Sequence, residues 1–231
     1  MAVVIIGFLI VDESLPQGNQ GPEAEALAEK MLNAIGHEQW DEIPIISWSF
    51  RGEHYFVWDK KNHCALVEWD DYSVALNLNG VTGKVRKGDA EIFGDEAENA
   101  VQTAYAFWCN DSFWLNAPAK IKDGGTVRKI VKYDQGPDRL LVQYMSGGVT
   151  PGDAYLWELN EEYLPVSYKM WVSIIPIGGV EATWEGWTDF DGAMIATSHK
   201  LGPLEIPLTD LKTGNSLSDF GLSDSLFMSF N

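Results

Sequence analysis

Cysteine and positive charge are both scarce in this sequence. Its two cysteines, Cys64 and Cys109, are too few for a disulfide scaffold or a cysteine-based zinc site. They either pair in an oxidising compartment or stay as two buried thiols, which the usual burial of free cysteine favours. The 231 residues include 16 Lys+Arg against 34 Asp+Glu, a formal net charge of −18. Because that field repels phosphate backbones, we expect no nucleic-acid partner.

Motifs of the common enzyme classes are also missing. The sequence has no Gly-x-Ser-x-Gly elbow, no His-Glu-x-x-His pair and no glycine-rich phosphate loop ahead of a helix. Residues 189–192 resemble the start of a calcium loop, but Lys200 stands where the bidentate Glu is required, so a hairpin turn is the better interpretation. We therefore expect no catalytic residue, no metal and no cofactor. One alternative stays open: a hydrolase assembled in three dimensions around His199 or His54 with a nearby carboxylate.

The most apolar run is too short to cross a membrane. Residues 2–11 are ten residues without a charge, whereas a spanning helix needs about 20 apolar residues. No Lys or Arg precedes the run and no small-residue cleavage site follows it, so the pattern is not that of a complete signal peptide. We interpret residues 1–11 as the remnant of an export signal or anchor. That interpretation favours the periplasm or cell envelope and contact with a membrane; the alternative is a first buried strand.

The remaining composition is typical of a globular protein rich in aromatic rings. Hydrophobic residues make up 45% and charged residues 22%, and there are 10 Trp. Residues 12–22 are polar with Gly and Pro, which predicts an exposed linker. Residues 23–212 then form one domain, and residues 213–231 a C-terminal tail.

Helical spacing of apolar residues occurs twice. It predicts helices over residues 23–35 and 95–108, each with acidic residues in its first turn. The pattern breaks down over residues 110–126, which predicts a loop. That loop is unusual because it carries Phe113, Trp114 and Leu115, and we interpret these three residues as a mobile lid.

Strand patterns dominate the rest of the chain. About eleven short runs of strand-forming residues are separated by turn residues, and they cover residues 45–51, 54–59, 64–69, 72–79, 127–133, 140–145, 154–159, 166–172, 180–188, 193–199 and 204–211. Few connections could hold a crossover helix. The expected fold is therefore mainly β with two or three helices, either a curved antiparallel sheet with helices on one side or a barrel closed part-way. Pro207 predicts an edge position for the last strand.

Several strands carry bulky apolar side chains on both faces. Trp171 lies opposite the more regular apolar face of its strand, and Trp184 and Trp187 fall on opposite faces of theirs. Two interpretations stay open: a thick solid core, or a hydrophobic cavity for a lipid or acyl chain. For the cavity, the candidate ligand-binding residues are Trp48, Phe50, Trp69, Trp171, Trp184 and Trp187, together with the lid residues Phe113, Trp114 and Leu115.

The order of these features resembles a known family. A short helix ending near Gly36 is followed by Trp40, a strand over residues 45–50, a His-Tyr-Phe-Val-Trp-Asp hairpin strand over residues 54–59 and the Phe-Trp-Leu-Asn-Ala-Pro segment over residues 113–118. Over residues 23–211 the chain resembles uncharacterised bacterial cell-envelope proteins related to the LolA/LolB-like lipoprotein carriers. The resemblance implies an unclosed antiparallel barrel of about eleven strands with helices plugging its open side. It also implies a hydrophobic ligand, a lipid or lipoprotein acyl chain; the alternative is a solid-core structural envelope protein.

Overall fold

The structure, a computed structural model, describes residues 12–146, 151–223 and 225–227. Thirteen strands form one antiparallel sheet in the order β6-β5-β4-β3-β2-β1-β15-β14-β11-β10-β9-β8-β7, and β12 pairs with β13 in a separate hairpin. The strands are β1 (Ile45–Phe50), β2 (His54–Asp59), β3 (Cys64–Trp69), β4 (Tyr72–Asn77), β5 (Thr82–Lys87), β6 (Ala90–Ile92), β7 (Thr126–Val131), β8 (Arg139–Tyr144), β9 (Ala154–Leu159), β10 (Pro165–Trp171), β11 (Val180–Thr183), β12 (Thr188–Phe190), β13 (Ala193–Ile195), β14 (Ser198–Leu201) and β15 (Leu204–Gly214). Since β6 and β7 are unpaired with each other at the two ends, the sheet is unclosed.

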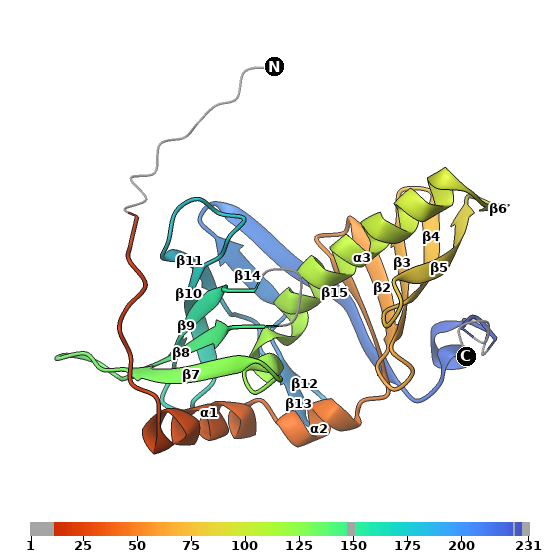
Figure 1. Ribbon diagram of the computed structural model, residues 1–231. Coiled ribbons are helices and arrows are strands. Elements are labelled where there is room, and N and C mark those ends of the chain that lie inside the picture. Colours follow the sequence, from red (N-terminus) through yellow and green to blue (C-terminus); the bar gives the residue numbers. More distant parts are fainter. Residues whose placement is uncertain (1–11, 147–150, 224, 228–231) are drawn as a thin grey trace.

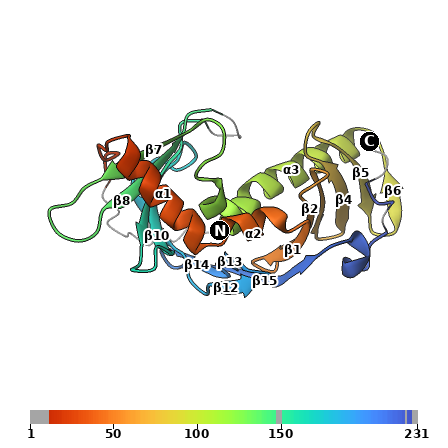
Figure 2. The same ribbon diagram turned by 90° about the horizontal axis from the view of Figure 1, so that it is seen from below.

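Three α-helices lie inside the curve of this sheet (Figures 1 and 2). They are α1 (Pro22–Ala34), α2 (His37–Glu42) and α3 (Asp95–Asn116), and two 3-10 turns are η1 (Ala117–Lys120) and η2 (Leu217–Phe220). The longest, α3, packs on β3, β4 and β5, whereas α1 packs on β7 and β8. The expected fold class, a mainly β unclosed antiparallel sheet with helices on one side, is confirmed. We call the face that meets the helices the concave face.

Both faces of the sheet bury apolar side chains, as the strand patterns predict. On β1, Trp48 and Phe50 belong to the large cluster on the concave face, while Ile45 belongs to a second cluster with Leu217 and Phe227. Leu15 packs in the same way on a third cluster at the other end of the sheet. The second apolar face is therefore covered by the two ends of the chain itself.

The segments assigned to a linker and a tail take part in this covering. Asn19 exchanges two backbone hydrogen bonds with Ile130, of 2.9 and 2.8 Å, along the free edge of β7. Glu13 donates its backbone N–H to Gly178 and pairs through its carboxylate with Lys169. Residues 1–11, interpreted as an export signal or anchor remnant, lie outside the described residues.

The predicted edge position of Pro207 is wrong. Its strand, β15, lies between β1 and β14 in the middle of the sheet. The register between β1 and β15 ends at the pair Phe50–Leu208, so Pro207, the residue next to Leu208 in β15, has no partner on β1. The missing N–H of Pro207 therefore costs no ladder bond on that side, and its carbonyl still accepts the N–H of Arg51 at 2.9 Å.

The predicted loop over residues 110–126 is also wrong in its first part. The helix α3 continues to Asn116, and Trp114 and Leu115 are buried on its inner side. No Gly or Pro interrupts the chain before Pro118, which begins the tighter turn η1, so nothing in the backbone chemistry ends the helix earlier. A mobile loop carrying Phe113, Trp114 and Leu115 is therefore not present.

Several short elements have no clear pattern in the sequence. The strand β5 reads Thr-Gly-Lys-Val-Arg-Lys, and only Val85 in it is buried, so it lacks the apolar alternation of a core strand. The predicted strands over residues 180–188 and 193–199 each divide, into β11 and β12 and into β13 and β14. Gly186 at a φ of 68° marks the first of these breaks.

Gly36 fixes the junction between α1 and α2. It has a φ of 64°, and a Cβ at this position would clash with the carbonyl oxygen of Gly192 in the β12–β13 turn. We expect Gly36→Ala to lower the free energy of unfolding by about 2–3 kcal/mol, because a left-handed conformation and a backbone clash add together. The control is Gly52→Ala, which has a φ of 70° but open space around it and should cost only about 1 kcal/mol. Equal losses in urea denaturation would contradict the close approach.

Candidate functional site

Aromatic rings form most of the concave face beneath the C-terminal half of α3. Trp157 of β9 lies 5.0 Å from Tyr168 of β10 and 5.3 Å from Trp184, which follows β11. All three side chains are at most 2% exposed. From the helix side, Trp114 of α3 lies 6.0 Å from Tyr168. The rings come from neighbouring strands because β9, β10 and β11 are adjacent in the sheet.

A second group of rings lies beneath the rest of α3. Trp48 stacks on Phe56 of β2 with ring centroids 4.6 Å apart. Trp58 of β2 meets Trp108 of α3 edge to face at 5.6 Å. These contacts join β1, β2 and α3 into one apolar cluster, which the first group of rings also belongs to.

Eight of the nine predicted binding residues lie in this cluster or, for Trp69, Phe113 and Trp187, pack against it half-buried. They are Trp48, Phe50, Trp69, Phe113, Trp114, Leu115, Trp184 and Trp187. Trp184 and Trp187, predicted on opposite faces, lie in the same cluster, with ring centroids 6.2 Å apart, because β11 ends at Thr183 before either residue.

Trp171 is the ninth predicted residue and does not join the others. It packs on the opposite face of the sheet with Leu15, and its indole N–H donates to the carbonyl of Glu13 at 2.6 Å. This position agrees with the strand pattern, which predicts Trp171 opposite the regular apolar face of its strand. The residues that sequence reasoning missed, Trp157 and Tyr168, alternate within their strands and could have been found by that signal.

A buried polar pair ties α3 to the sheet. Asp111 of α3 is 1% exposed, and its Oδ2 lies 2.7 Å from Nδ1 of His54 on β2. The other oxygen, Oδ1, accepts a hydrogen bond from Asn110 at 2.8 Å. Burial raises the pKa of the Asp111 carboxyl, although the hydrogen bonds from Asn110 and His54 act in the opposite direction. The His54 ring also stacks on Phe107 at 3.8 Å, so both ends of the pair are held.

His199 is fully buried beside Trp184, at a ring distance of 4.4 Å. Its Nδ1 donates to the carbonyl of Thr183 at 3.1 Å. Burial lowers the pKa of His199 to about 4, which outweighs the opposite effects of the Thr183 and Trp114 carbonyls and of Glu185. The imidazole is therefore neutral at physiological pH, and its neighbour on Nδ1 is a backbone carbonyl rather than a carboxylate.

Eight buried polar atoms of the described side chains have no hydrogen-bond partner. Five are indole N–H groups, and the set is Nε1 of Trp48, Trp58, Trp108, Trp157 and Trp184, Oδ1 of Asn116, the hydroxyl of Tyr144 and Nε2 of His199. Each unpaired buried group costs about 1–3 kcal/mol relative to its hydrated state. All eight belong to residues of the sheet's concave side or of α3. The interface between α3 and the concave face is therefore densely packed, but several of its buried polar groups have no hydrogen-bond partner.

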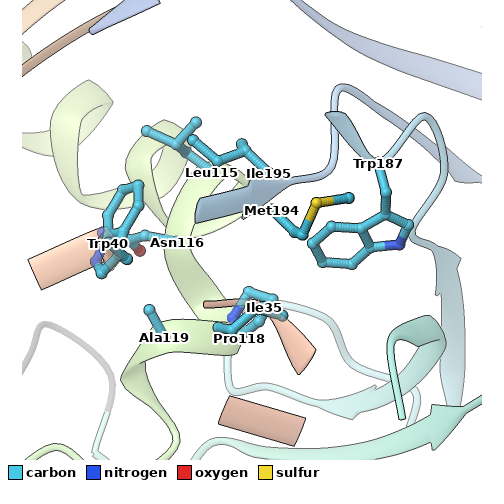
Figure 3. Close-up of a pocket in the computed structure, with 9 residues that line it drawn as sticks. All are labelled: Ile35, Trp40, Leu115, Asn116, Pro118, Ala119, Trp187, Met194 and Ile195. Carbon is cyan, nitrogen blue, oxygen red and sulfur yellow. The ribbon is translucent and has the colours of Figure 1, made fainter. Parts of the chain in front are cut away.

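A small cavity lies where the helices converge with the β12–β13 hairpin (Figure 3). Its lining is apolar apart from Asn116, and includes Ile35, Trp40, Leu115, Pro118, Ala119, Trp187, Met194 and Ile195. The cavity volume is about 10 Å³, which holds a single water molecule at most. An acyl chain does not fit there, because α3 and its neighbours fill the concave face.

Lys60, in the turn after β2, lies against the same helix junction. Its amino group is 4.2 Å from the ring of Trp40 and donates to the carbonyl of that residue. Burial is the main cause that lowers the pKa of Lys60 to about 8. The amine must therefore lose its proton more readily in the folded chain than in the unfolded one.

This shift gives Lys60 a defined effect on stability. Because the folded pKa is below the unfolded one, the penalty of the buried charge is relieved, and stability rises, between pH 8 and about 10.5. We expect Lys60→Met to have a higher free energy of unfolding than the parent chain, because it has no charge to bury. This difference should shrink by about 1 kcal/mol over that interval, after allowance for solvent screening. Urea denaturation at pH 7.5 and 10.5 measures it, with the exposed neighbour as control in Lys61→Met. A difference independent of pH would contradict the burial of the charge.

The two thiols are also side chains of the described residues that could act as nucleophiles or metal ligands. Cys64 is buried, Cys109 is half-buried, and both are free. Within the described residues, no group of three or more His, Cys, Asp or Glu side chains is arranged to hold a metal ion. In the same part of the chain, no helix combines the length and apolarity needed to span a bilayer.

Comparison with known proteins gives similarity to solved structures but not to known sequences. No family model matches the chain, and no curated protein matches it. A crystal structure of a DUF1329 family protein from Desulfovibrio piger is similar over 90% of this chain and 98% of that chain. The two are 13% identical, with a TM-score of 0.42. At these values the likeness supports no conclusion about function, which has to come from the site itself.

Proposed function

We propose that this protein binds a hydrophobic ligand, a lipid or an acyl chain, between α3 and the concave face of the sheet. The observation that carries the proposal is the incomplete fit of α3. Five of the ten tryptophans bury an indole N–H there without an acceptor. A surface that had only to hold a permanent core would gain by replacing these groups with apolar ones.

Ligand entry requires α3 to move, and its polar ties differ along its length. At the N-terminal end, Glu96 pairs with Lys87 at 2.9 Å and accepts the Tyr72 hydroxyl at 2.9 Å, all on the exposed surface. Exposed pairs of this kind contribute at most about 1 kcal/mol. Toward the C-terminal end, the tie is the buried pair between His54 and Asp111. The N-terminal half of α3 is therefore the part that lifts most easily, and a ligand that enters there has to extend beneath the C-terminal half to reach the rings of Trp157 and Trp184.

The hydrophobic gain is large enough to drive such a movement. Each buried methylene contributes about 0.8 kcal/mol, so a chain of twelve carbons gains on the order of 10 kcal/mol before ordering costs. On the helix side, Ala100 and Ala104 are the small residues that face the sheet from this half of α3. Displacing small side chains forfeits less apolar contact than displacing large ones would.

We place the protein in the cell envelope and assign it a binding role rather than a catalytic one. The apolar sequence of residues 2–11 supports the envelope location and contact with a membrane. The hydrogen bond from His199 to a backbone carbonyl supports a structural role for that histidine. The pairing of His54 with Asp111 is explained by the attachment of α3, and the net charge of −18 argues against a nucleic-acid partner.

Photo-crosslinking on the parent chain tests the proposal without a substitution. A fatty acid and a phospholipid that carry a diazirine on the acyl chain are the probes, and peptide mass spectrometry maps the adducts. We expect adducts on α3 and on concave-face strands, for example at Trp157 or Phe107. Trp171, on the opposite face, serves as an internal control. Adducts confined to the Trp171 face, or no saturable adduct, would refute binding beneath α3.

One observation favours a second function, that of a structural envelope protein with a solid core. The concave face is filled by α3, and the apolar cavity beside it is about 10 Å³. On this alternative the unpaired indole groups are tolerated defects of a permanent core. The same crosslinking experiment separates the two functions, because a solid core gives no saturable adduct on the concave face.

A further inference from the structure

The unpartnered atoms of the candidate site are mostly of one kind. An indole N–H can only donate a hydrogen bond, so five of the eight atoms are donors. Oδ1 of Asn116 and Nε2 of His199 are acceptors, and the Tyr144 hydroxyl serves as either. We propose that the ligand presents a neutral carbonyl oxygen, as an ester or ketone, to the indole N–H groups of Trp157 and Trp184. This inference rests on the proposed function and names the chemical class of its ligand.

The two donors lie on one continuous aromatic surface. Their ring centroids are 5.3 Å apart, and Tyr168 lies between their strands, 5.0 Å from Trp157 and 5.8 Å from Trp184. Trp157 is fully buried and Trp184 is 2% exposed, so both donors are shielded from bulk water in the closed protein. A hydrogen bond made in such a low-dielectric place is electrostatically stronger than one in water. A carbonyl on an otherwise apolar ligand supplies the acceptor that these donors lack.

The surroundings favour a neutral acceptor over an anionic one. The ionisable ring beside Trp184 is His199, which burial keeps in its neutral form. The charged group that acts on His199 is the exposed carboxylate of Glu185, which is paired with Lys200 at 3.1 Å, so Lys200 is already engaged at the surface. A free carboxylate or a phosphate would have to leave water without a free cation to receive it. An ester or ketone carbonyl avoids this penalty and keeps its hydrogen bond.

A ligand series of closely similar chain length tests the inference. The probes are methyl laurate, tridecane and laurate anion, each competing with the fluorescent reporter N-phenyl-1-naphthylamine on the full chain. We expect the ester to bind on the order of tenfold more tightly than the alkane, as one buried hydrogen bond implies, and the anion to bind more weakly than the ester.

Two substitutions locate the effect. Trp184→Phe and Trp157→Phe remove one unpaired N–H each and should bring the ratio of ester to alkane affinity toward one. The matched control is Trp171→Phe, because Trp171 lies on the opposite face of the sheet and its indole N–H already donates to the carbonyl of Glu13 at 2.6 Å. That variant should keep the tenfold ratio. Since the ratio compares two ligands on the same variant, a general loss of stability does not alter it.

The possible outcomes separate this inference from the function beneath it. A parent chain that binds ester and alkane equally refutes carbonyl recognition and leaves hydrophobic binding intact. A ratio unchanged in both Trp184→Phe and Trp157→Phe refutes the assignment to these two donors. Displacement of the reporter by none of the probes, in a chain that is folded by circular dichroism, contradicts the proposed function and the inference with it.

Discussion

Acidification should destabilise the protein through a single buried histidine. The folded pKa of His199 is about 4 and the unfolded value about 6.5, so the unfolded chain takes up the proton first. The stability contributed by neutral His199 is complete above pH 6.5 and is lost as the pH falls toward 4. Integrated over that window, the loss is about 3 kcal/mol. The cause is desolvation of the imidazolium in the cluster around Trp184.

The variant His199→Asn isolates this contribution. Asn keeps a donor for the Thr183 carbonyl but does not titrate. Between pH 7 and pH 4, the free energy of unfolding of the variant should therefore fall by about 3 kcal/mol less than that of the parent chain. Urea denaturation of both proteins at several pH values measures this difference. Because the same carboxylates titrate in both proteins, their contribution cancels when the two curves are subtracted. His63→Asn, in an exposed turn, should behave like the parent chain. Parallel pH curves for parent and His199→Asn would contradict the burial of a neutral imidazole.

Removal of His54 should be the most damaging change to the attachment of α3. His54→Ala leaves the Asp111 carboxylate 1% exposed and without its partner on β2, and we expect a loss of about 3–5 kcal/mol at pH 8. The loss should shrink as the pH falls, because burial already raises the pKa of Asp111 and protonation of its carboxylate removes the buried charge. Chemical denaturation over a series of decreasing pH values measures both effects.

Two further variants test the cause of this loss. In His54→Ala/Asp111→Ala no unpaired charge remains, so the double variant should lose less than the sum of the two single variants. Tyr72→Phe removes a different tie of α3, the exposed hydrogen bond to Glu96, and should cost less than about 1 kcal/mol. Additive single-variant losses, or a Tyr72→Phe loss as large as that of His54→Ala, would show that the buried pair does not hold the helix.

The strands with regular alternation were predictable from the sequence, and those without it were not. In β4, Val74 and Leu76 alternate with Ala75, and this period of two is that of a strand whose successive side chains point to opposite faces of the sheet. In β5, Lys84 and Arg86 lie outward and carry no apolar signal, because that strand buries only one side chain. Its place in the sheet comes from pairing with β4, which is a tertiary property.

Which aromatic residues form the candidate site was predictable from the sequence, but how they and the polar residues pair in space was not. The aromatic residues Trp48 and Trp184 stand out in alternating segments, so their burial on the concave face follows from pattern. The pairing of His54 with Asp111 joins positions 57 residues apart on two elements, and no local spacing predicts it. The wrong prediction of a loop at Phe113 has a similar origin. The end of α3 is apolar on more than one side, and the contact that explains Phe113, with Tyr155 at 4.9 Å, is visible only in the folded chain.

Native mass spectrometry tests the central claim, that a hydrophobic ligand binds beneath α3, most directly. The full chain is purified gently from a bacterial host with an outer membrane, and its mass is recorded before and after incubation with phospholipids. Our account predicts an added mass that matches a lipid or acylated species, present as a one-to-one adduct and lost in a chain cross-linked between Lys87 and Glu96. A bare protein mass under both conditions would contradict ligand binding and leave the solid-core protein as the function of this fold.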